Sequence, residues 1–230
     1  EMLRSLVGSE MCIRDSPWHI HICFILSLFK EKETLHIGVV LLYFVSTNKH
    51  KFDEICAILA KHKIKLLWKE LELQEREGLT LEEIAIEKAK QAFAKLKKPL
   101  IVEDTGIFFE GFTNFPGAKA KRVYERLGFK GLLGLASKKS KKAYFKTAIC
   151  FTDGKQYKLF LGILKGKIAD RVYCKNKDVM PYEKIFVPAG FNKPLCMLSR
   201  AKKNEISHRA KAAEKFAKWL KKNIGEITER

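Results

Sequence analysis

The sequence predicts an α/β fold in which helices flank a mixed β-sheet, and three observations indicate it. Residues 100–102 are Leu-Ile-Val, an apolar run without alternation that is typical of a strand covered on both faces. Strand-like and helical patterns alternate over residues 37–96, as they do in α/β proteins. Asp153-Gly154 joins two further strand-like runs and predicts a hairpin, so the sheet also contains antiparallel pairs.

Length and charge bound the classes of function. With 230 residues the chain can bury one sizeable core or two lobes that share a sheet. Its 45 lysines and arginines against 26 acids give a net charge of +19, which favours an anionic partner such as a nucleotide, a nucleic acid or an acidic surface. The lysine clusters carry no interleaved aromatics, so a solvated basic surface is the simpler interpretation.

Cysteine spacing and hydropathy indicate the compartment. Six cysteines without a C-x-x-C pair disfavour a zinc ribbon or a disulfide scaffold, and we expect reduced core thiols. The apolar runs at residues 20–29 and 37–45 fall short of the ~20 residues that span a membrane. No small-residue cleavage site follows the first run, so a cytoplasmic protein without a membrane segment is expected.

The sequence pattern of the first 36 residues differs from that of the rest of the chain. Residues 5–16 resemble a translated sequencing adapter, and residues 1–36 are therefore predicted to be an extraneous or poorly ordered extension. Residues 37–230 are predicted to form the functional domain.

A strand at residues 37–45 leads through small polar residues into a helix with apolar positions from Phe52 to Ala60. Backbone N–H groups and the helix dipole at such a junction favour a bound anion, and lysines stand beside it. An ordinary capped helix explains the same pattern.

A second strand is predicted at residues 64–73, followed by glutamates, and a helix at residues 80–96. Thr80 and Glu83 have the spacing of a capping box at the start of that helix. Lys88 lies on the apolar stripe of the helix, where it either reaches an anion or extends its charged end to the surface.

The apolar run at residues 100–102 is predicted to end in Glu103 and Asp104, between Pro99 and Gly106. Ligands bind at the carboxyl edge of α/β sheets, and two acids there suit Mg²⁺ that takes its other ligands from phosphates and water. The alternative is a pair of solvated carboxylates in a loop.

The rest of the chain continues the alternation of strand-like and helical patterns. Residues 115–117 form a turn, and residues 120–133 a helix broken near Gly128. Strands are expected at residues 143–151, 156–164 and 185–188. A final helix starts at Ser207 and stops at Gly225. His208 and Arg209 in its first turn hint at an anionic or hydrogen-bonding ligand, because cations are unfavourable at that end of a helix.

This ordered set of motifs resembles the inosine triphosphate pyrophosphatase family over roughly residues 37–224. The matching segments are Ser46-x-Asn48-x-x-Lys51, Glu103-Asp104-Thr105-Gly106, Phe115-Pro116-Gly117, Ile185-Phe186-Val187-Pro188 and Lys203-Asn204-x-x-Ser207-His208-Arg209. Each motif alone is weak, and their order and spacing together are specific.

The resemblance implies Mg²⁺-dependent hydrolysis of deaminated purine nucleoside triphosphates to the monophosphate and pyrophosphate. It further implies an elongated mixed sheet in two lobes with the substrate cleft between them, and a homodimer. The resemblance implies that Asp104 and Lys88 are catalytic and that Glu72 and Asp104 bind the metal, with Glu75 as the alternative to Glu72. It implies phosphate contacts for Ser46, Asn48 and Lys51, and a further substrate contact for Lys121. The base contacts that it implies are Tyr182, Lys203, Ser207, His208 and Arg209.

The chain departs from the family pattern on the base side. An aromatic-Gly-aromatic-Asp-Pro run reads Met180-Pro181-Tyr182-Glu183-Lys184 here, and a Thr-Phe-Ala-Glu-Met segment is replaced around Met197. Hydrolysis with weaker base discrimination is therefore expected.

Two other functions compete with this interpretation. A nucleic-acid-binding protein is suggested by the charge and would show steeply salt-dependent binding, although no stable nucleic-acid partner is expected. A Maf-like pyrophosphatase with another base preference is disfavoured by Ser207-His208-Arg209.

Overall fold

A computed structural model of the chain describes residues 41–228, and the predicted extension at residues 1–36 lies outside them. The described chain contains one seven-stranded sheet, whose main path has the order β2-β1-β3-β5-β6-β7. The strands are β1 (Leu41–Val45), β2 (Lys65–Lys69), β3 (Leu100–Phe109), β4 (Pro116–Gly117), β5 (Lys142–Thr152), β6 (Tyr157–Ile168) and β7 (Phe186–Pro188).

The sheet is mixed, as predicted. Strand β1 pairs in parallel with β2 and β3, whereas β3, β5, β6 and β7 pair antiparallel in succession. The predicted hairpin at Asp153-Gly154 joins β5 to β6, and Gly154 has the positive φ that this turn requires.

Five α-helices and two short 3₁₀ segments accompany the sheet in the described chain. They are α2 (Lys49–Ala60), α3 (Leu81–Leu96), α4 (Ala120–Lys138), α5 (Arg200–Ile206), α6 (His208–Thr228), η2 (Pro181–Lys184) and η3 (Leu195–Met197). Asn48 caps α2, and both bonds of the predicted Thr80–Glu83 capping box are present at α3. None of the described helices is long and apolar enough to cross a membrane.

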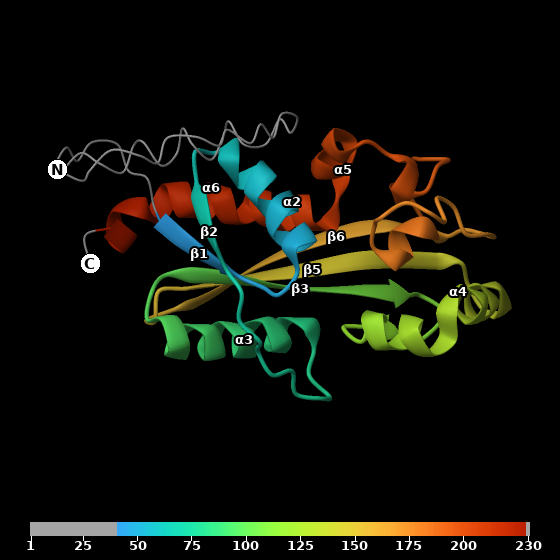
Figure 1. Cartoon of the computed structure of the whole chain (residues 1–230), viewed down its shortest axis with the longest axis horizontal. Helices are drawn as coiled ribbons and strands as arrows, with labels where there is room; N and C mark the ends of the chain where they lie inside the picture. The colour runs from blue at the N-terminus through green and yellow to red at the C-terminus, as the bar shows by residue number, and fades with distance from the viewer. Residues whose placement is uncertain (1–40, 229–230) are drawn as a thin grey trace, which may run out of the picture. The chain divides into compact units, whose positions relative to one another are not determined.

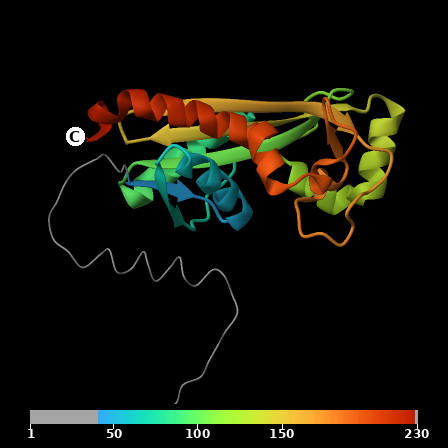
Figure 2. The ribbon, with the colours of Figure 1, turned by 90° about the horizontal axis from the view of Figure 1, so that it is seen from above.

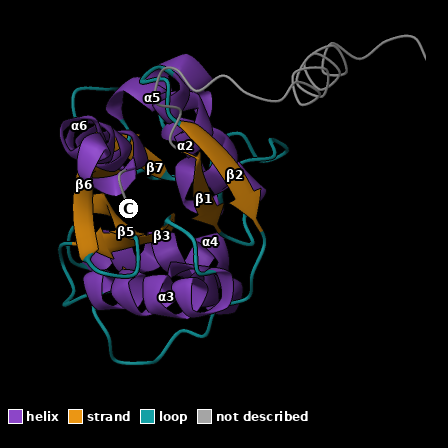
Figure 3. Ribbon diagram, turned by 90° about the vertical axis from the view of Figure 1, so that its left-hand side faces the viewer, coloured by secondary structure: helices purple, strands orange, loops and turns teal. Residues whose placement is uncertain are grey.

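The helices cover both faces of the sheet (Figure 1, Figure 3). Helices α2 and α6 pack on one face in a cluster that includes Phe44, Ile101 and Phe216. Helix α3 packs on the other face with Val102 and Cys150. A third cluster holds α4, the far ends of β3, β5 and β6, and the segment around β7. Figure 2 shows α4 and that segment at the same end of the sheet, which is the end away from the carboxyl terminus.

Strand β3 does not end at the acid pair, and the prediction of a strand end there is wrong. The strand continues to Phe109 because β5 pairs with it along residues 100–109. On the other side, β1 pairs with residues 100–102 and β4 with residues 107–108. Within the described chain, no strand pairs with residues 103–106 on that side, and we call this stretch the β3 window.

Helix ends differ from the prediction in two further places. Helix α4 has the expected break at Gly128 but runs on to Lys138. Helix α6 continues through Gly225 to Thr228, since one glycine costs only about 1 kcal/mol within a helix. Helix α5 was not predicted at all. The four described cysteines are free; Cys150 and Cys196 are buried, as expected of core thiols, whereas Cys56 and Cys174 are only half-buried. Cys12 and Cys23 lie outside the described residues.

Lysines of α6 contact the outer edge of β6. Strand β7 pairs with β6 only at residues 166–168, so among the described residues the preceding part of β6 pairs with β5 alone. Lys211 Nζ donates to the carbonyl oxygen of Ile163, and Lys215 Nζ to that of Leu161, each over 2.8 Å. These two ammonium groups therefore cover carbonyl groups of the unpaired edge.

Gly162 allows the first turn of α6 to lie directly on β6. A Cβ at this position would stand 1.9 Å from the carbonyl oxygen of His208 and 2.6 Å from the amide nitrogen of Ala212. Both contacts are with backbone atoms, so the helix itself would have to move.

We expect Gly162→Ala to destabilise the fold by about 1–3 kcal/mol, because overpacking against backbone forces a shift of α6. Gly134→Ala is the matched control. Gly134 lies in α4 with nothing within 4 Å of its added Cβ, and alanine there should leave stability level or raise it by up to ~1 kcal/mol. Urea unfolding of both variants measures the difference. Equal stability of the two would contradict the assigned role of Gly162.

Candidate active site

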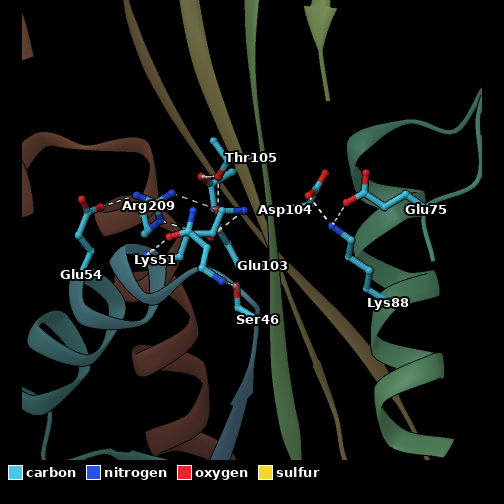
Figure 4. Close-up of polar contacts among 11 residues, drawn as sticks. Ser46, Lys51, Glu54, Glu75, Lys88, Glu103, Asp104, Thr105 and Arg209 are labelled. Atoms are coloured by element: carbon cyan, nitrogen blue, oxygen red, sulfur yellow. Dashed lines mark hydrogen bonds and ion pairs between the residues drawn. The ribbon is translucent and has the colours of Figure 1, made fainter. Parts of the chain in front are cut away.

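The candidate site surrounds the β3 window, where Glu103 and Asp104 point to opposite faces of the sheet (Figure 4). Glu103 faces α2 and α6, and Asp104 faces α3. Both are buried, with 3% and 6% of their surfaces exposed. The idea that the two acids act together as one metal-binding pair is therefore wrong, because successive residues of a continuous strand diverge.

Glu103 is the centre of a buried ionic cluster. Arg209 donates to both of its carboxylate oxygens over 3.4 and 3.5 Å, and Lys51 Nζ lies 3.5 Å from Oε2. The Thr105 hydroxyl donates to Oε1 and stands 2.5 Å from the hydroxyl of Thr147. The Arg209 NH1 group binds the carboxylate of Glu54 on α2. The cluster thus connects β3, β5, α2 and α6.

The charges in this cluster hold each other ionised. Burial alone would raise the pKa of Glu103, but the positive charges of Arg209 and Lys51 outweigh it and lower the pKa to about 2. Burial alone would likewise lower the pKa of Arg209, and the carboxylates of Glu103 and Glu54 raise it instead. Glu103 is therefore a permanent anion at neutral pH, already neutralised by the protein's own cations.

Asp104 is the more available acid. Its Oδ1 accepts a hydrogen bond of 2.8 Å from Lys88 Nζ, which also lies 2.5 Å from Glu75 Oε1. Its Oδ2 is buried and has no hydrogen-bond partner among the described residues. The sequence singled out Lys88 because it stands on an apolar stripe, and the structure gives it a carboxylate partner on each side.

Burial raises the pKa of Asp104 above its ordinary value, although Lys51 and Lys88 oppose the shift. A carboxylate with a raised pKa and one free oxygen is a better proton acceptor than a surface acid. A buried unpaired oxygen also loses its hydration without compensation, so a ligand that binds there gains from meeting it.

The turn between β1 and α2 is ordered by its own side chains. Ser46 Oγ accepts from the Asn48 amide over 3.1 Å, and Asn48 Oδ1 accepts from the Lys51 amide over 3.3 Å. The side chain of Lys51 extends from this turn to Glu103 (Figure 4). The first backbone N–H groups of α2 have no partner within the helix, and with Lys51 they provide the predicted setting for an anion.

The residues predicted to contact a base are divided between core and cavity. Ser207, His208 and Arg209 are buried; Ser207 Oγ accepts from the Ala210 amide, and the His208 ring stacks on Phe145 at 4.6 Å. Tyr182 is also buried, and its hydroxyl donates to the carbonyl oxygen of Ala120 over 2.9 Å.

Lys203 does face a cavity, of about 340 Å³, and forms an ion pair of 2.9 Å with Glu183 at its wall. The cavity is lined by His50, Asp53, Glu54, Lys177, Asp178, Val179, Met180, Glu183, Leu198, Arg200 and Lys203. Glu54 belongs both to this lining and to the ionic cluster, so the cavity adjoins the β3 window.

Two predicted residues lie away from these contacts. Glu72 is exposed, and Lys95 Nζ donates to its backbone carbonyl oxygen over 3.2 Å. The side chain of Lys121 is 90% exposed and pairs with Glu125 over 3.9 Å. Of the two glutamates left open as second metal ligands, Glu75 is the one that reaches the Lys88–Asp104 pair. Within the described residues no three carboxylate, histidine or thiol groups converge closely enough to hold a metal by themselves.

Sequence inspection missed two members of the cluster. Glu54 follows Lys51 by three residues and therefore shares a face of α2, which is a readable signal. Thr147 stands opposite Thr105 in the antiparallel register, and that register cannot be read before the strands are paired.

Known proteins are similar to this chain over most of the described residues. A family model described as "Ham1 family" matches residues 42–219. A dITP/XTP pyrophosphatase of Saccharolobus solfataricus is 37% identical over 177 residues, which cover 76% of this chain and 91% of that protein. An inosine triphosphate pyrophosphatase of Scheffersomyces stipitis is 34% identical, with 77% and 96% covered. The structure of a HAM1 protein from Coxiella burnetii superposes with a TM-score of 0.69 at 22% identity, covering 80% of this chain and all of that one.

We expect acid pH to destabilise the fold through His208. Burial first, and then the charge of Arg209, hold the pKa of His208 well below its ordinary value of about 6.5. Below pH ~6.5 the unfolded chain binds a proton that the folded chain does not, so stability falls by up to ~1.4 kcal/mol per pH unit through this residue. The loss is absent above pH ~6.5.

His208→Phe keeps a ring against Phe145 and cannot titrate. Unfolding free energies of both proteins between pH 7.5 and 5 give the contribution of His208 as their difference. This difference should move in favour of the variant as the pH falls, and parallel curves would contradict a buried neutral histidine.

Proposed function

The chain belongs to the Ham1 family, and we propose that it hydrolyses deaminated purine nucleoside triphosphates to the monophosphate and pyrophosphate. One observation carries the proposal. Asp104 is a buried carboxylate with Lys88 on one oxygen and no partner on the other, and it stands on the β3 window near Lys51 and the start of α2. The names of the relatives, dITP/XTP pyrophosphatase and inosine triphosphate pyrophosphatase, support the choice of substrate.

Asp104 is the proposed general base. Cleavage of a triphosphate between the α- and β-phosphates requires a water molecule aligned on the α-phosphorus, and the free Oδ2 can accept its proton. Lys88 fixes the orientation of the carboxylate through Oδ1. The leaving pyrophosphate carries away the bonding electrons, so the protein needs positive charge on that side more than it needs an acid.

Lys51 and the turn at residues 46–48 are the proposed phosphate site. Lys51 lies within electrostatic reach of both Glu103 and Asp104, and a polyphosphate at the start of α2 meets backbone N–H groups and this ammonium group together. Lys121 has a side chain that is 90% exposed, and it remains a prediction as a substrate contact.

Mg²⁺ is the proposed cofactor, and the residues present suit it. Oδ2 of Asp104 has two lone pairs, so the same oxygen could face Mg²⁺ with one and the aligned water with the other, and Glu75 is the second carboxylate that we propose to hold the ion. When bound, Mg²⁺ neutralises charge on the triphosphate and polarises its phosphoryl oxygens. Few protein ligands are needed, because Mg²⁺ commonly keeps waters and binds substrate phosphates.

The cavity next to Glu54 is the proposed base pocket. Lys203 can donate to a keto oxygen of the base, and Met180 supplies an apolar but flexible wall. Ser207, His208 and Arg209 stay predictions as base contacts, because in the structure they bind protein partners. With Met180 in place of an aromatic ring, we propose weaker base discrimination than is usual in the family.

A homodimer is also proposed from the family resemblance, and a cytoplasmic location from the hydropathy of the sequence. Sedimentation of the purified chain and imaging of a tagged copy in cells test them. Neither proposal affects the assignments above.

The activity is tested with a panel of inosine, xanthosine, guanosine and adenosine triphosphates, assayed for pyrophosphate with and without Mg²⁺. We expect Mg²⁺-dependent release with the first two preferred, and at least a ~10²-fold loss of turnover in folded Asp104→Asn. A wild-type chain that releases no pyrophosphate from any of them would refute the proposal. Near wild-type turnover in the variant would remove Asp104 from the mechanism.

The second metal ligand is tested by two matched substitutions. Glu75→Gln should raise the Mg²⁺ concentration needed for half-maximal activity by about 10- to 100-fold, as loss of a ligand or its support does. Glu72→Gln, in the same loop, should change it less than twofold. A titration with Mg²⁺ at saturating substrate measures both, and the reverse order would assign the role to Glu72.

A further inference from the structure

Trp68 lies beside the turn at residues 46–48, between β1 and α2. It lies on β2 opposite Phe44 of β1, in a parallel register that ends one residue later at Val45 and Lys69. With 36% of its surface exposed, it is one of the few large hydrophobic residues at the surface of the described chain. Strand β2 stands at the edge of the sheet, and Trp68 near its end stacks on Phe52 of α2.

The indole of Trp68 contacts Ser46 in the turn between β1 and α2, and also Lys49 and Phe52 in the first turn of α2. Its Nε1 donates a hydrogen bond of 2.7 Å to the carbonyl oxygen of Ser46. Its ring stacks on Phe52 in the first turn of α2, with centroids 5.9 Å apart and planes 21° apart. Lys49 Nζ lies 5.7 Å from the ring centroid.

Together with other hydrogen bonds, these contacts fix the position of Ser46. Its amide donates to the carbonyl oxygen of Lys69 over 3.2 Å, and its carbonyl oxygen accepts from Trp68. Its hydroxyl accepts from Asn48, whose own side chain accepts from the Lys51 amide. Trp68 is therefore the outer end of a chain of hydrogen bonds that leads to Lys51 and, through its ammonium group, to Glu103.

We infer that Trp68 is a positioning residue for anion binding at the β1–α2 turn. It acts through Ser46 and touches no reacting atom. The inference rests on the proposed function for the identity of the anion, a nucleoside triphosphate. A packing role alone does not need the indole N–H, whereas the position of the turn depends on that bond.

Trp68→Phe keeps a ring on Phe52 and removes only the indole donor. We expect the KM for inosine triphosphate to rise about three- to tenfold, the effect of one neutral hydrogen bond, with kcat within twofold. Amides of residues 46–51 should also exchange faster with solvent deuterium. Trp219→Phe is the matched control, because Trp219 is half-buried and its ring contacts within the described chain are with Phe151, Phe160 and Phe216 of β5, β6 and α6.

Benzothienylalanine at position 68 is the second variant, since it keeps the shape of the indole and lacks the N–H. It should reproduce the rise in KM even if phenylalanine lowers stability. An unchanged KM in this variant overturns the inference, and so does a fall in kcat with KM unchanged. A similar rise in KM in Trp219→Phe also overturns it.

Tripolyphosphate binding separates this inference from the proposed function. If the wild-type chain hydrolyses no nucleotide, the proposed function fails, and calorimetric binding of inorganic tripolyphosphate then decides the role of Trp68. Weaker binding by Trp68→Phe than by Trp219→Phe supports the inference. Equal binding by the two variants overturns it.

Discussion

The ion pair between Glu103 and Arg209 is the interaction on which the rest of the site depends. It joins the central strand to the first turn of α6 across 106 positions of sequence, and Lys51 and Glu54 add α2 to the same cluster. Removing one partner of a buried pair leaves an uncompensated charge and typically costs 3–5 kcal/mol. The positions of the helices around the β3 window are therefore tied to electrostatic neutrality as well as to packing.

Because β3 is continuous, its two acids lie in different surroundings. Since Glu103 and Asp104 project to opposite faces, one carboxylate is saturated by permanent cations while the other keeps a free oxygen. The depressed pKa of Glu103 and the raised pKa of Asp104 follow from these different surroundings. Neighbouring acids on one strand can in this way have opposite pKa shifts.

Much of the fold could be predicted from local sequence. Helices α2 and α3, their caps, the break at Gly128 and the β5–β6 hairpin follow from periodicity and from Gly, Asn and Thr at fixed positions. The end of β3 could not, because Gly106 signals a turn locally and pairing with β5 overrides it. In the site, Lys88 was recognisable as a charge on an apolar stripe. The partner of Arg209 was not, since a contact between residues so distant in sequence leaves no local pattern.

The lysines across the outer edge of β6 have a consequence for the behaviour of the chain in a crowded solution. An incoming strand would have to displace the ammonium groups of Lys211 and Lys215 from the carbonyl oxygens of Ile163 and Leu161. Part of the large positive charge thus opposes aggregation through exposed backbone. Acetylation of these two lysines would remove their charges from this edge and so weaken its protection against association.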